Sequence, residues 1–281
     1  MKRSTQKLCF SVLAWVVLGV GSTPLAVSAQ QGTDDYRLYF PLVYRTIDAC
    51  RPIEGTVYRQ IGVVADSRYA RPPGLAPEDD RELNIYLRGY SLTEDYAGLW
   101  WYGGPTDYKA PQLYTLFADE RTPVFSRLYR VDEERKIWPV TMSGFEVTPG
   151  EIIRVPDSGY DIGNGKDVMV LYASRSQITL KYTREDNVVF GYTVHIEGIC
   201  TEPSLQALYD ELNAAGRRDL PALTGKQPLG RAWGNEIRVV IRDTGSFMDP
   251  RSCKDWWWGR CVPPDWWDGT GIMGVPALSL P

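Results

Sequence analysis

The sequence predicts a mostly β protein that contains one short helix. Many short segments are rich in β-branched and aromatic residues and are bounded by Pro, Gly or Asp, which is typical of strands separated by turns. Aromatic residues make up 12% of the chain, with 17 Tyr and 10 Trp, which favours β-structure or carbohydrate contact over disorder. The strand pattern becomes longer and cleaner after about Thr148. We therefore expect a β-sandwich-like domain over residues 30–147 and a second β-domain over residues 148–252.

The first 29 residues are typical of a secretory signal peptide. Lys2, Arg3 and Lys7 precede an apolar run over residues 8–20, which is short for a membrane span, and small residues then allow cleavage after Ala29. An uncleaved N-terminal anchor is the alternative. We expect a secreted chain of about 250 residues, extracellular or associated with the cell envelope, with no membrane segment after cleavage.

The predicted first domain holds seven short strand-like segments. Each has the composition of a strand and ends at a turn-forming residue. The surface loop predicted at residues 70–80 is rich in Pro and acidic residues. In order, the predicted strands cover residues 36–45, 56–64, 81–90, 97–104, 112–118, 127–133 and 138–147.

The predicted second domain alternates longer strands with one helix. Within residues 202–218, Leu205, Leu208 and Leu212 recur at helical spacing, and Ser204 is a candidate N-cap. Gly216 fits the glycine that often follows a helix. The predicted strands cover residues 148–156, 166–174, 177–185, 187–198 and 236–243.

Four cysteines remain after the predicted cleavage, and an even number in an exported chain indicates two disulfides. Three pairings are possible for Cys50, Cys200, Cys253 and Cys261. The segment between Cys253 and Cys261 is short and turn-rich, so we favour that bridge, which leaves Cys50 to pair with Cys200. A zinc–thiolate site is disfavoured because the chain has one His and no Cys-x-x-Cys motif.

Charge and isolated motifs exclude several classes of function. The net charge is −4 and no basic stripe exists, which argues against nucleic acid as a partner. The single histidine, His195, is expected to be a packed or surface residue on a strand. The Asp-Thr-Gly at residues 243–245 is explained by a turn, because an aspartic-protease dyad needs two such loops.

Five segments follow one another between residues 157 and 251: "DSGYD", "GYTVHIEG", "LYDELN", "TGKQPLGRA" and "EIRVVIRDTGSFMDPR". In this order they resemble the motifs of the lysostaphin-type zinc endopeptidases, which cut peptide cross-bridges in bacterial cell walls. The resemblance implies an open β-barrel for residues 148–252.

The same resemblance implies a degenerate site. Asp157 stands at the first zinc histidine and Asp161 at the aspartate ligand of the family, while Glu211 replaces the catalytic histidine. Glu236 and Arg238 replace the two histidines of the last strand. A protonated guanidinium has no lone pair for a metal, so we expect no metal and no cofactor. An ion cluster of Asp157, Arg238 and Asp161 would then fill the space of the zinc ion.

The C-terminal tail, residues 253–281, is predicted to be closed by a disulfide and is rich in tryptophan. One interpretation is a flap that packs its rings onto the barrel, and the other is a stacking platform for sugars or peptidoglycan. Side chains alternate along an extended chain, so at least one of three adjacent tryptophans should face outward. The candidate binding residues are Trp256, Trp257, Trp258, Trp266 and Trp267.

These observations predict a secreted binding or scaffold module without catalytic activity. Its expected partner is a cell-wall glycan such as peptidoglycan, a peptide, or another envelope protein. The alternative is an active extracellular hydrolase, either a cell-wall endopeptidase or a glycosidase. A glycosidase would need two carboxylates about 5–10 Å apart. The candidates for that pair are Asp157, Asp161, Glu211 and Glu236.

Overall fold

The computed structural model describes residues 50–65, 69, 71–93, 106–133 and 138–260. Within these ranges the protein is mostly β, with 13 strands in two antiparallel sheets and one longer helix. The predicted fold class is therefore confirmed. The predicted strands at residues 36–45 and 97–104 and the predicted leader lie outside the described residues.

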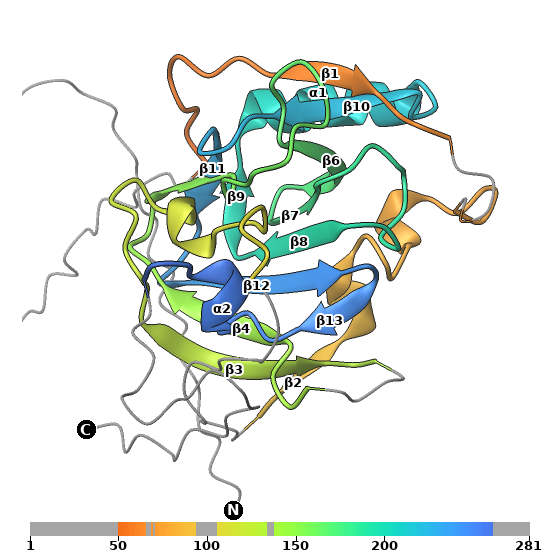
Figure 1. Ribbon diagram of the computed structural model, residues 1–281. Coiled ribbons are helices and arrows are strands. Elements are labelled where there is room, and N and C mark those ends of the chain that lie inside the picture. Colours follow the sequence, from red (N-terminus) through yellow and green to blue (C-terminus); the bar gives the residue numbers. More distant parts are fainter. Residues whose placement is uncertain (1–49, 66–68, 70, 94–105, 134–137, 261–281) are drawn as a thin grey trace, which may run out of the picture. The chain divides into compact units, whose positions relative to one another are not determined.

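The larger sheet is open, with β1 at one edge and β2 at the other (Figure 1). Its order is β1 (Arg59–Gly62), β10 (Asp219–Leu223), β6 (Val168–Ser174), β7 (Gln177–Lys181), β8 (Tyr192–Glu197), β12 (Glu236–Asp243), β4 (Met142–Glu146), β3 (Phe125–Val131) and β2 (Tyr90–Leu92). β13 (Ser246–Met248) forms a hairpin with β12. A smaller sheet has the order β5 (Ile152–Arg154), β11 (Pro228–Ala232) and β9 (Ile199–Thr201). The described strands do not close into a barrel.

The larger sheet crosses the boundary that the sequence predicted between residues 147 and 148. β4 precedes that boundary and pairs with β12, so that Phe145 lies opposite Ile237 and Ser143 opposite Val239. β1 likewise pairs with β10. The change in strand texture near Thr148 therefore marks no break in the sheet, and the described residues on its two sides share one hydrogen-bonded structure.

One face of the larger sheet carries the main hydrophobic core. Alternate residues of the central strands point to it, including Ile178 and Leu180 of β7, Val194 of β8, and Ile237 and Val239 of β12. Full burial of each such side chain contributes about 1.5–3 kcal/mol. This alternation is what the sequence pattern of residues 177–185 and 236–243 predicted, because successive side chains of a strand face opposite sides.

The opposite face of the same strands is unusually polar for buried structure. The side chains that alternate with the apolar ones form three rows across β7, β8 and β12: Gln177–Glu197–Arg238, Thr179–His195–Val240 and Lys181–Thr193–Arg242. Residues 83–85 contact these rows. The Thr179 hydroxyl donates a 2.6 Å hydrogen bond to the Leu83 carbonyl, and the Gln177 amide donates a 2.7 Å bond to Asn84 Oδ1.

The helices differ in detail from those predicted. α1 (Pro203–Ala214) begins after Glu202, whose carboxylate accepts hydrogen bonds from the backbone N–H groups of Ser204 and Leu205. Glu202 is therefore the N-cap, and the prediction of Ser204 as the N-cap was wrong. Gly216 has φ of 91°, as predicted for the residue that ends the helix. No helix in the described part of the chain has the length and apolar character needed to cross a membrane.

Two predicted strands contain 3-10 helices instead, and two strands, β10 and β11, were missed. Residues 113–116 form the 3-10 helix η3 (Leu113–Leu116), and residues 85–88 form η2 (Ile85–Arg88), within two segments predicted to be strands. A third short 3-10 helix is η1 (Pro77–Asp79). β10 and β11 were not predicted. Both contain a proline, Pro221 and Pro228, which lowers the expectation of a strand because proline lacks a backbone donor.

A disulfide joins Cys50 to Cys200, as predicted. It closes a loop of 150 residues, for which chain-entropy arguments give a stabilisation on the order of 5 kcal/mol. Cys253 is disulfide-bonded as well, at the start of α2 (Cys253–Trp256). Cys261, its predicted partner, lies outside the described residues.

Candidate functional site

The structure separates the residues that the resemblance brought together. Asp157 forms an ion pair with Lys226, at 3.6 Å between Oδ2 and Nζ. Asp161 lies in an exposed loop and accepts a 2.7 Å hydrogen bond from the backbone N–H of Gly163. Glu211 is an exposed residue of α1. These three carboxylates therefore belong to three separate sets of contacts.

Glu236 and Arg238 lie on the same face of β12, but each has a partner that the sequence did not indicate. Glu236 accepts a 2.9 Å hydrogen bond from the Tyr129 hydroxyl. Arg238 forms its ion pair with Glu197 on β8, at 3.2 Å between Nε and Oε2. The expected cluster of Asp157, Arg238 and Asp161 is therefore wrong. In the described ranges, no three His, Cys, Asp or Glu side chains are grouped so as to hold a metal ion.

Glu197 is the centre of the site that the structure does bring together. Its side chain is almost completely buried, and its Oε2 accepts a 2.9 Å hydrogen bond from the Tyr90 hydroxyl. Its Oε1 has no hydrogen-bond partner among the described residues. Burial raises the pKa of the Glu197 carboxyl, while Arg238 and the Tyr90 hydroxyl act in the opposite direction. Ionised Glu197 is therefore a costly group whose main compensation is Arg238.

Arg238 is held in place by packing more than by hydrogen bonds. Its guanidinium carbon lies 5.3 Å from the centre of the Tyr90 ring, within the range of a cation–π contact. Nε and the Glu197 carboxylate form an ion pair, but the N–H is not aligned for a hydrogen bond with any described residue. The guanidinium thus packs against an aromatic ring, while its N–H donors are not used up by the described residues.

These two residues line a small pocket of about 250 Å³ that two exposed aromatic rings flank. Trp233 is 50% exposed and Tyr86 is 67% exposed. Ser176 and Gln177 supply further polar groups to the lining. Exposed rings of this size carry a large apolar area, which a ligand can cover. A pocket with aromatic sides and a few convergent polar groups is the usual form of a small-molecule site.

A tight turn places Trp233 at this pocket. Gly198 follows β8 with φ of 78°, and its carbonyl accepts a 2.8 Å hydrogen bond from the Trp233 N–H. A Cβ at Gly198 would lie 2.7 Å from the Glu236 carbonyl oxygen, so only glycine fits here. The Arg175 guanidinium packs 5.3 Å from the Trp233 ring and adds a positive charge at the rim.

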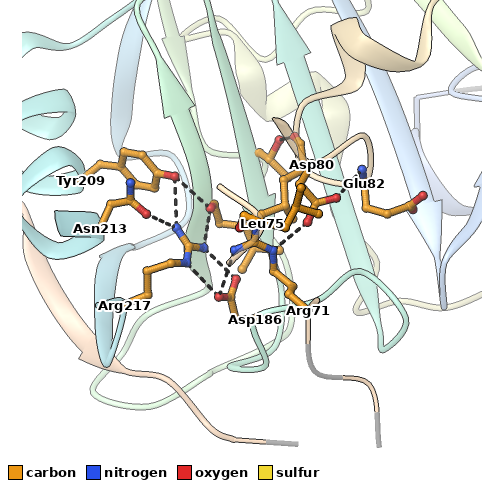
Figure 2. Close-up of polar contacts among 11 residues, drawn as sticks. Arg71, Leu75, Asp80, Glu82, Asp186, Tyr209, Asn213 and Arg217 are labelled. Atoms are coloured by element: carbon orange, nitrogen blue, oxygen red, sulfur yellow. Dashed lines mark hydrogen bonds and ion pairs between the residues drawn. The ribbon is translucent and has the colours of Figure 1, made fainter. Parts of the chain in front are cut away.

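An arginine network fastens the segment that carries Tyr86. Figure 2 shows Arg217 between Tyr209 and Asp186, and Arg71 between Asp186 and Asp80. Arg217 donates two hydrogen bonds of 2.8 and 2.7 Å to the Asp186 carboxylate, in the forked geometry that makes such pairs strong. Arg71 pairs with Asp80 at 2.7 Å and also lies 3.8 Å from Asp186. The network joins α1 and the loop between β7 and β8 to the chain that leads into η1 and η2.

The second row of the polar face contains a neutral histidine. The Thr179 hydroxyl donates its proton to the Leu83 carbonyl, so its oxygen accepts from His195 Nδ1, 3.0 Å away. This network assigns the proton to Nδ1, and Nε2 is left without a partner among the described residues. Burial and the charge of Arg242 lower the pKa of His195 well below its usual value. Its placement on a strand is as predicted, and it is packed rather than exposed.

The third row holds two buried cations. Burial lowers the pKa of Lys181 to about 7, and its ammonium group donates to the Phe190 carbonyl. Arg242 donates to the Gly245 carbonyl and pairs with Glu82 at 2.8 Å. Arg242 also lines an open pocket of about 580 Å³. Among the described residues its charged lining consists of three arginines and three acids, namely Arg81, Arg88, Arg242, Glu82, Asp132 and Glu133. These described charges are balanced, so they favour neither sign of ligand.

The predicted tryptophan platform is only partly available. Trp256 and Trp257 are buried, and their indole N–H groups donate to the carbonyls of Asp249 and Pro250 at 3.0 and 2.8 Å. These two rings are core residues, so their prediction as binding residues is corrected. Trp258 is 51% exposed, in line with the expectation that one ring of the three faces outward. Trp266 and Trp267 lie outside the described residues.

Glu197, Trp233 and Tyr86 were not singled out in the sequence. The signal that could have indicated Glu197 is its place in "YTVHIEG", where it alternates with buried apolar residues and so must lie on the opposite face. No such signal exists for its pairing with Arg238, because that depends on the register between β8 and β12.

Comparison with known proteins adds no assignment. No model of a known protein family matches the chain, and no curated protein has a significantly similar sequence. The resemblance to the lysostaphin-type endopeptidases therefore stays a prediction.

Proposed function

We propose that this chain is an exported, non-catalytic binding module of the cell envelope or extracellular space. Its ligand is a glycan, of which peptidoglycan is one candidate, and the binding site is the pocket between Tyr86 and Trp233. A scaffold role toward another envelope protein is compatible with this proposal, because a module that binds glycan can also bring a partner to it.

The observation that carries the proposal is the Glu197–Arg238 pair at an open pocket flanked by two exposed aromatic rings. Burying an ion pair is costly and is weak evidence for stability alone. Aromatic rings contribute apolar area to a ligand, and charged groups in the same pocket fix its orientation. The combination of this ion pair with exposed aromatic rings is better explained by ligand recognition than by packing of the protein interior.

The disulfide between Cys50 and Cys200 supports an exported location. Structural disulfides form and persist in oxidising compartments and are rare where thiols are kept reduced. This argument agrees with the predicted signal peptide, although the two rest on different parts of the chain.

The contacts favour binding over hydrolysis. A glycosidase of the usual kind needs a carboxylic acid and a second carboxylate around the scissile bond. Among the described residues, Glu197 is the carboxylate that lines this pocket, and its Oε2 is occupied by Tyr90 and Arg238. Glu236, on the neighbouring strand, is bound by Tyr129. We therefore keep hydrolysis as an outcome of the test and not as a second proposal.

The test is a binding screen with the full exported chain. Muropeptides and a panel of oligosaccharides are titrated while heat and tryptophan fluorescence are recorded, and the products are analysed for cleavage. Trp233→Ala and Trp258→Ala form a matched pair, because the two rings are equally exposed on different surfaces. The proposal expects binding without cleavage, lost in Trp233→Ala and kept in Trp258→Ala.

Each other result has a definite meaning. Loss of binding in Trp258→Ala alone moves the site to the tryptophan tail and overturns the proposed pocket. Cleavage of any glycan or muropeptide overturns the non-catalytic assignment. Absence of binding to every member of the panel overturns a glycan ligand altogether.

A further inference from the structure

We propose that the pocket between Tyr86 and Trp233 selects a sugar that carries a carboxylate, and that Arg238 binds that carboxylate. This inference rests on the proposed function and narrows it from glycans in general to acidic saccharides, such as chains of uronic acids.

The Arg238 guanidinium keeps donors that the described residues do not use. No hydrogen bond from its Nη atoms is found among the described residues, and its Nε is not aligned with Glu197. The guanidinium carbon lies 5.3 Å from the centre of the Tyr90 ring. A planar guanidinium with unused parallel donors is suited to a carboxylate, which accepts two such bonds at once.

Charged side chains at and beside the pocket favour an anionic ligand. Arg238 lines it and Arg175 packs on the ring of Trp233, 5.3 Å away, whereas Glu197 is the acid in the lining. Oε2 of Glu197 is already bound by the Tyr90 hydroxyl. Among the described residues the lining itself holds one arginine and one carboxylate, and Arg175 adds a further positive charge beside Trp233, outside the lining. A ligand with one negative charge would compensate this additional positive charge.

The size and the walls of the pocket fit a single sugar ring. A volume of about 250 Å³ lies below the range of roughly 300–1,000 Å³ that is usual for drug-sized ligands. It therefore suits one ring-sized group of a larger chain. Trp233 and Tyr86 present apolar ring faces on which a sugar ring can pack, while Ser176 and Gln177 offer hydrogen-bonding groups.

The test compares two ligands with the same sugar chain, of which one carries free carboxylates and the other carries neutral methyl esters. Tri-galacturonic acid and its full methyl ester are titrated by calorimetry into the wild-type chain, into Arg238→Gln and into Glu197→Gln. Arg59→Gln is the matched control, because Arg59 is an exposed arginine on β1 away from the pocket. Thermal unfolding of each variant shows whether it is folded at the temperature of the titration.

The inference expects the acid to bind at least about tenfold more tightly than the ester. This preference should vanish in Arg238→Gln and persist in Arg59→Gln. Glu197→Gln keeps the shape of the pocket and removes the competing negative charge, so it should strengthen binding of the acid and not of the ester. If Arg238→Gln is unfolded, the Glu197→Gln result alone decides.

Equal binding of acid and ester overturns the inference and leaves the proposed glycan site intact. Binding of a peptide with a free C-terminal carboxylate, without binding of either sugar, overturns the inference and the glycan ligand together. Absence of binding to these probes and to the whole glycan panel has the same consequence.

Discussion

Glu197 and Arg238 face each other across β8 and β12, with 3.2 Å between the carboxylate Oε2 and the guanidinium Nε. The pair places two ionisable groups on the polar face of a sheet whose other face is the hydrophobic core. Each of the two depends on the other: Glu197 is buried, and Arg238 is the cation that compensates it. Stability and binding should therefore respond together to changes at either residue.

Removal of Arg238 should make stability depend on pH. We expect Arg238→Ala to lower the free energy of unfolding by about 2–4 kcal/mol at pH 7.5, because Glu197 is left buried without a cation. Burial already raises the Glu197 pKa, so the folded chain holds this proton at pH values where the unfolded chain releases it. Stability from this group is present at low pH and is lost as pH rises through the folded pKa.

The measurement is urea unfolding of wild type and Arg238→Ala at pH 4 and pH 7.5. The deficit of the variant should be small at pH 4, where Glu197 is protonated, and full at pH 7.5. Adding Glu197→Gln to the variant should abolish this difference. A deficit of the same size at both pH values would contradict the assigned role of Glu197.

The buried histidine should oppose folding in acid. Burial, and then the charge of Arg242, lower the pKa of His195, so below pH 6.5 the unfolded chain binds a proton that the folded chain does not. Stability from this group is therefore lost as pH falls, by about 1.4 kcal/mol per pH unit below 6.5. His195→Gln should remove that part of the pH dependence. Parallel pH profiles for wild type and variant would show that His195 is not buried in the neutral form.

The arginine network of Figure 2 should contribute measurably to stability. Arg217→Met should cost about 2–4 kcal/mol, because it leaves Asp186 without its forked partner and removes the bonds to Tyr209 and Asn213. Arg218→Met is the matched control, since Arg218 is an exposed neighbour, and it should change stability by less than about 0.5 kcal/mol. If the two substitutions lower the free energy of unfolding equally in denaturant unfolding, the network does not make the predicted contribution to stability.

Loss of the bridge between Cys50 and Cys200 should lower stability without changing which ligand the protein binds. The double substitution Cys50→Ser, Cys200→Ser is expected to cost about 2–5 kcal/mol, because a long loop is released in the unfolded state. Thermal unfolding measures the loss. If a reducing agent lowers the melting temperature of the wild type and not that of the double variant, the bridge between Cys50 and Cys200 is the one that is reduced. An unchanged melting temperature in the double variant would contradict the structural role of this bridge.

The sequence predicted the fold class well, for a reason visible in single strands. β7 and β12 alternate apolar and polar residues, and the apolar set, such as Ile178 and Ile237, forms the core in the structure. Local composition misled where tertiary contacts decide. Leu113 and Leu116 belong to an apolar segment that was predicted to be a strand, but they form a buried 3-10 helix. β10 was not predicted because it contains Pro221, although it pairs with β1 on one side and β6 on the other.

The site was harder to predict because it is built from strand register. Arg238 was singled out as a candidate site residue, but its partner was expected to be Asp161 and is Glu197. That partner follows from the alignment of β12 with β8, which no local pattern encodes. Trp233 lies after β11, an element that was not predicted, so its place beside the pocket could not be expected from the sequence.

The position of a bound acidic oligosaccharide is the decisive observation, and a crystal of the full exported chain soaked in tri-galacturonic acid would supply it. We expect the sugar ring between Tyr86 and Trp233, with its carboxylate within hydrogen-bond distance of the Arg238 Nη atoms. A sugar bound at Trp258 with an empty pocket at Arg238, or a metal ion held by Asp157 and Asp161, would contradict this account.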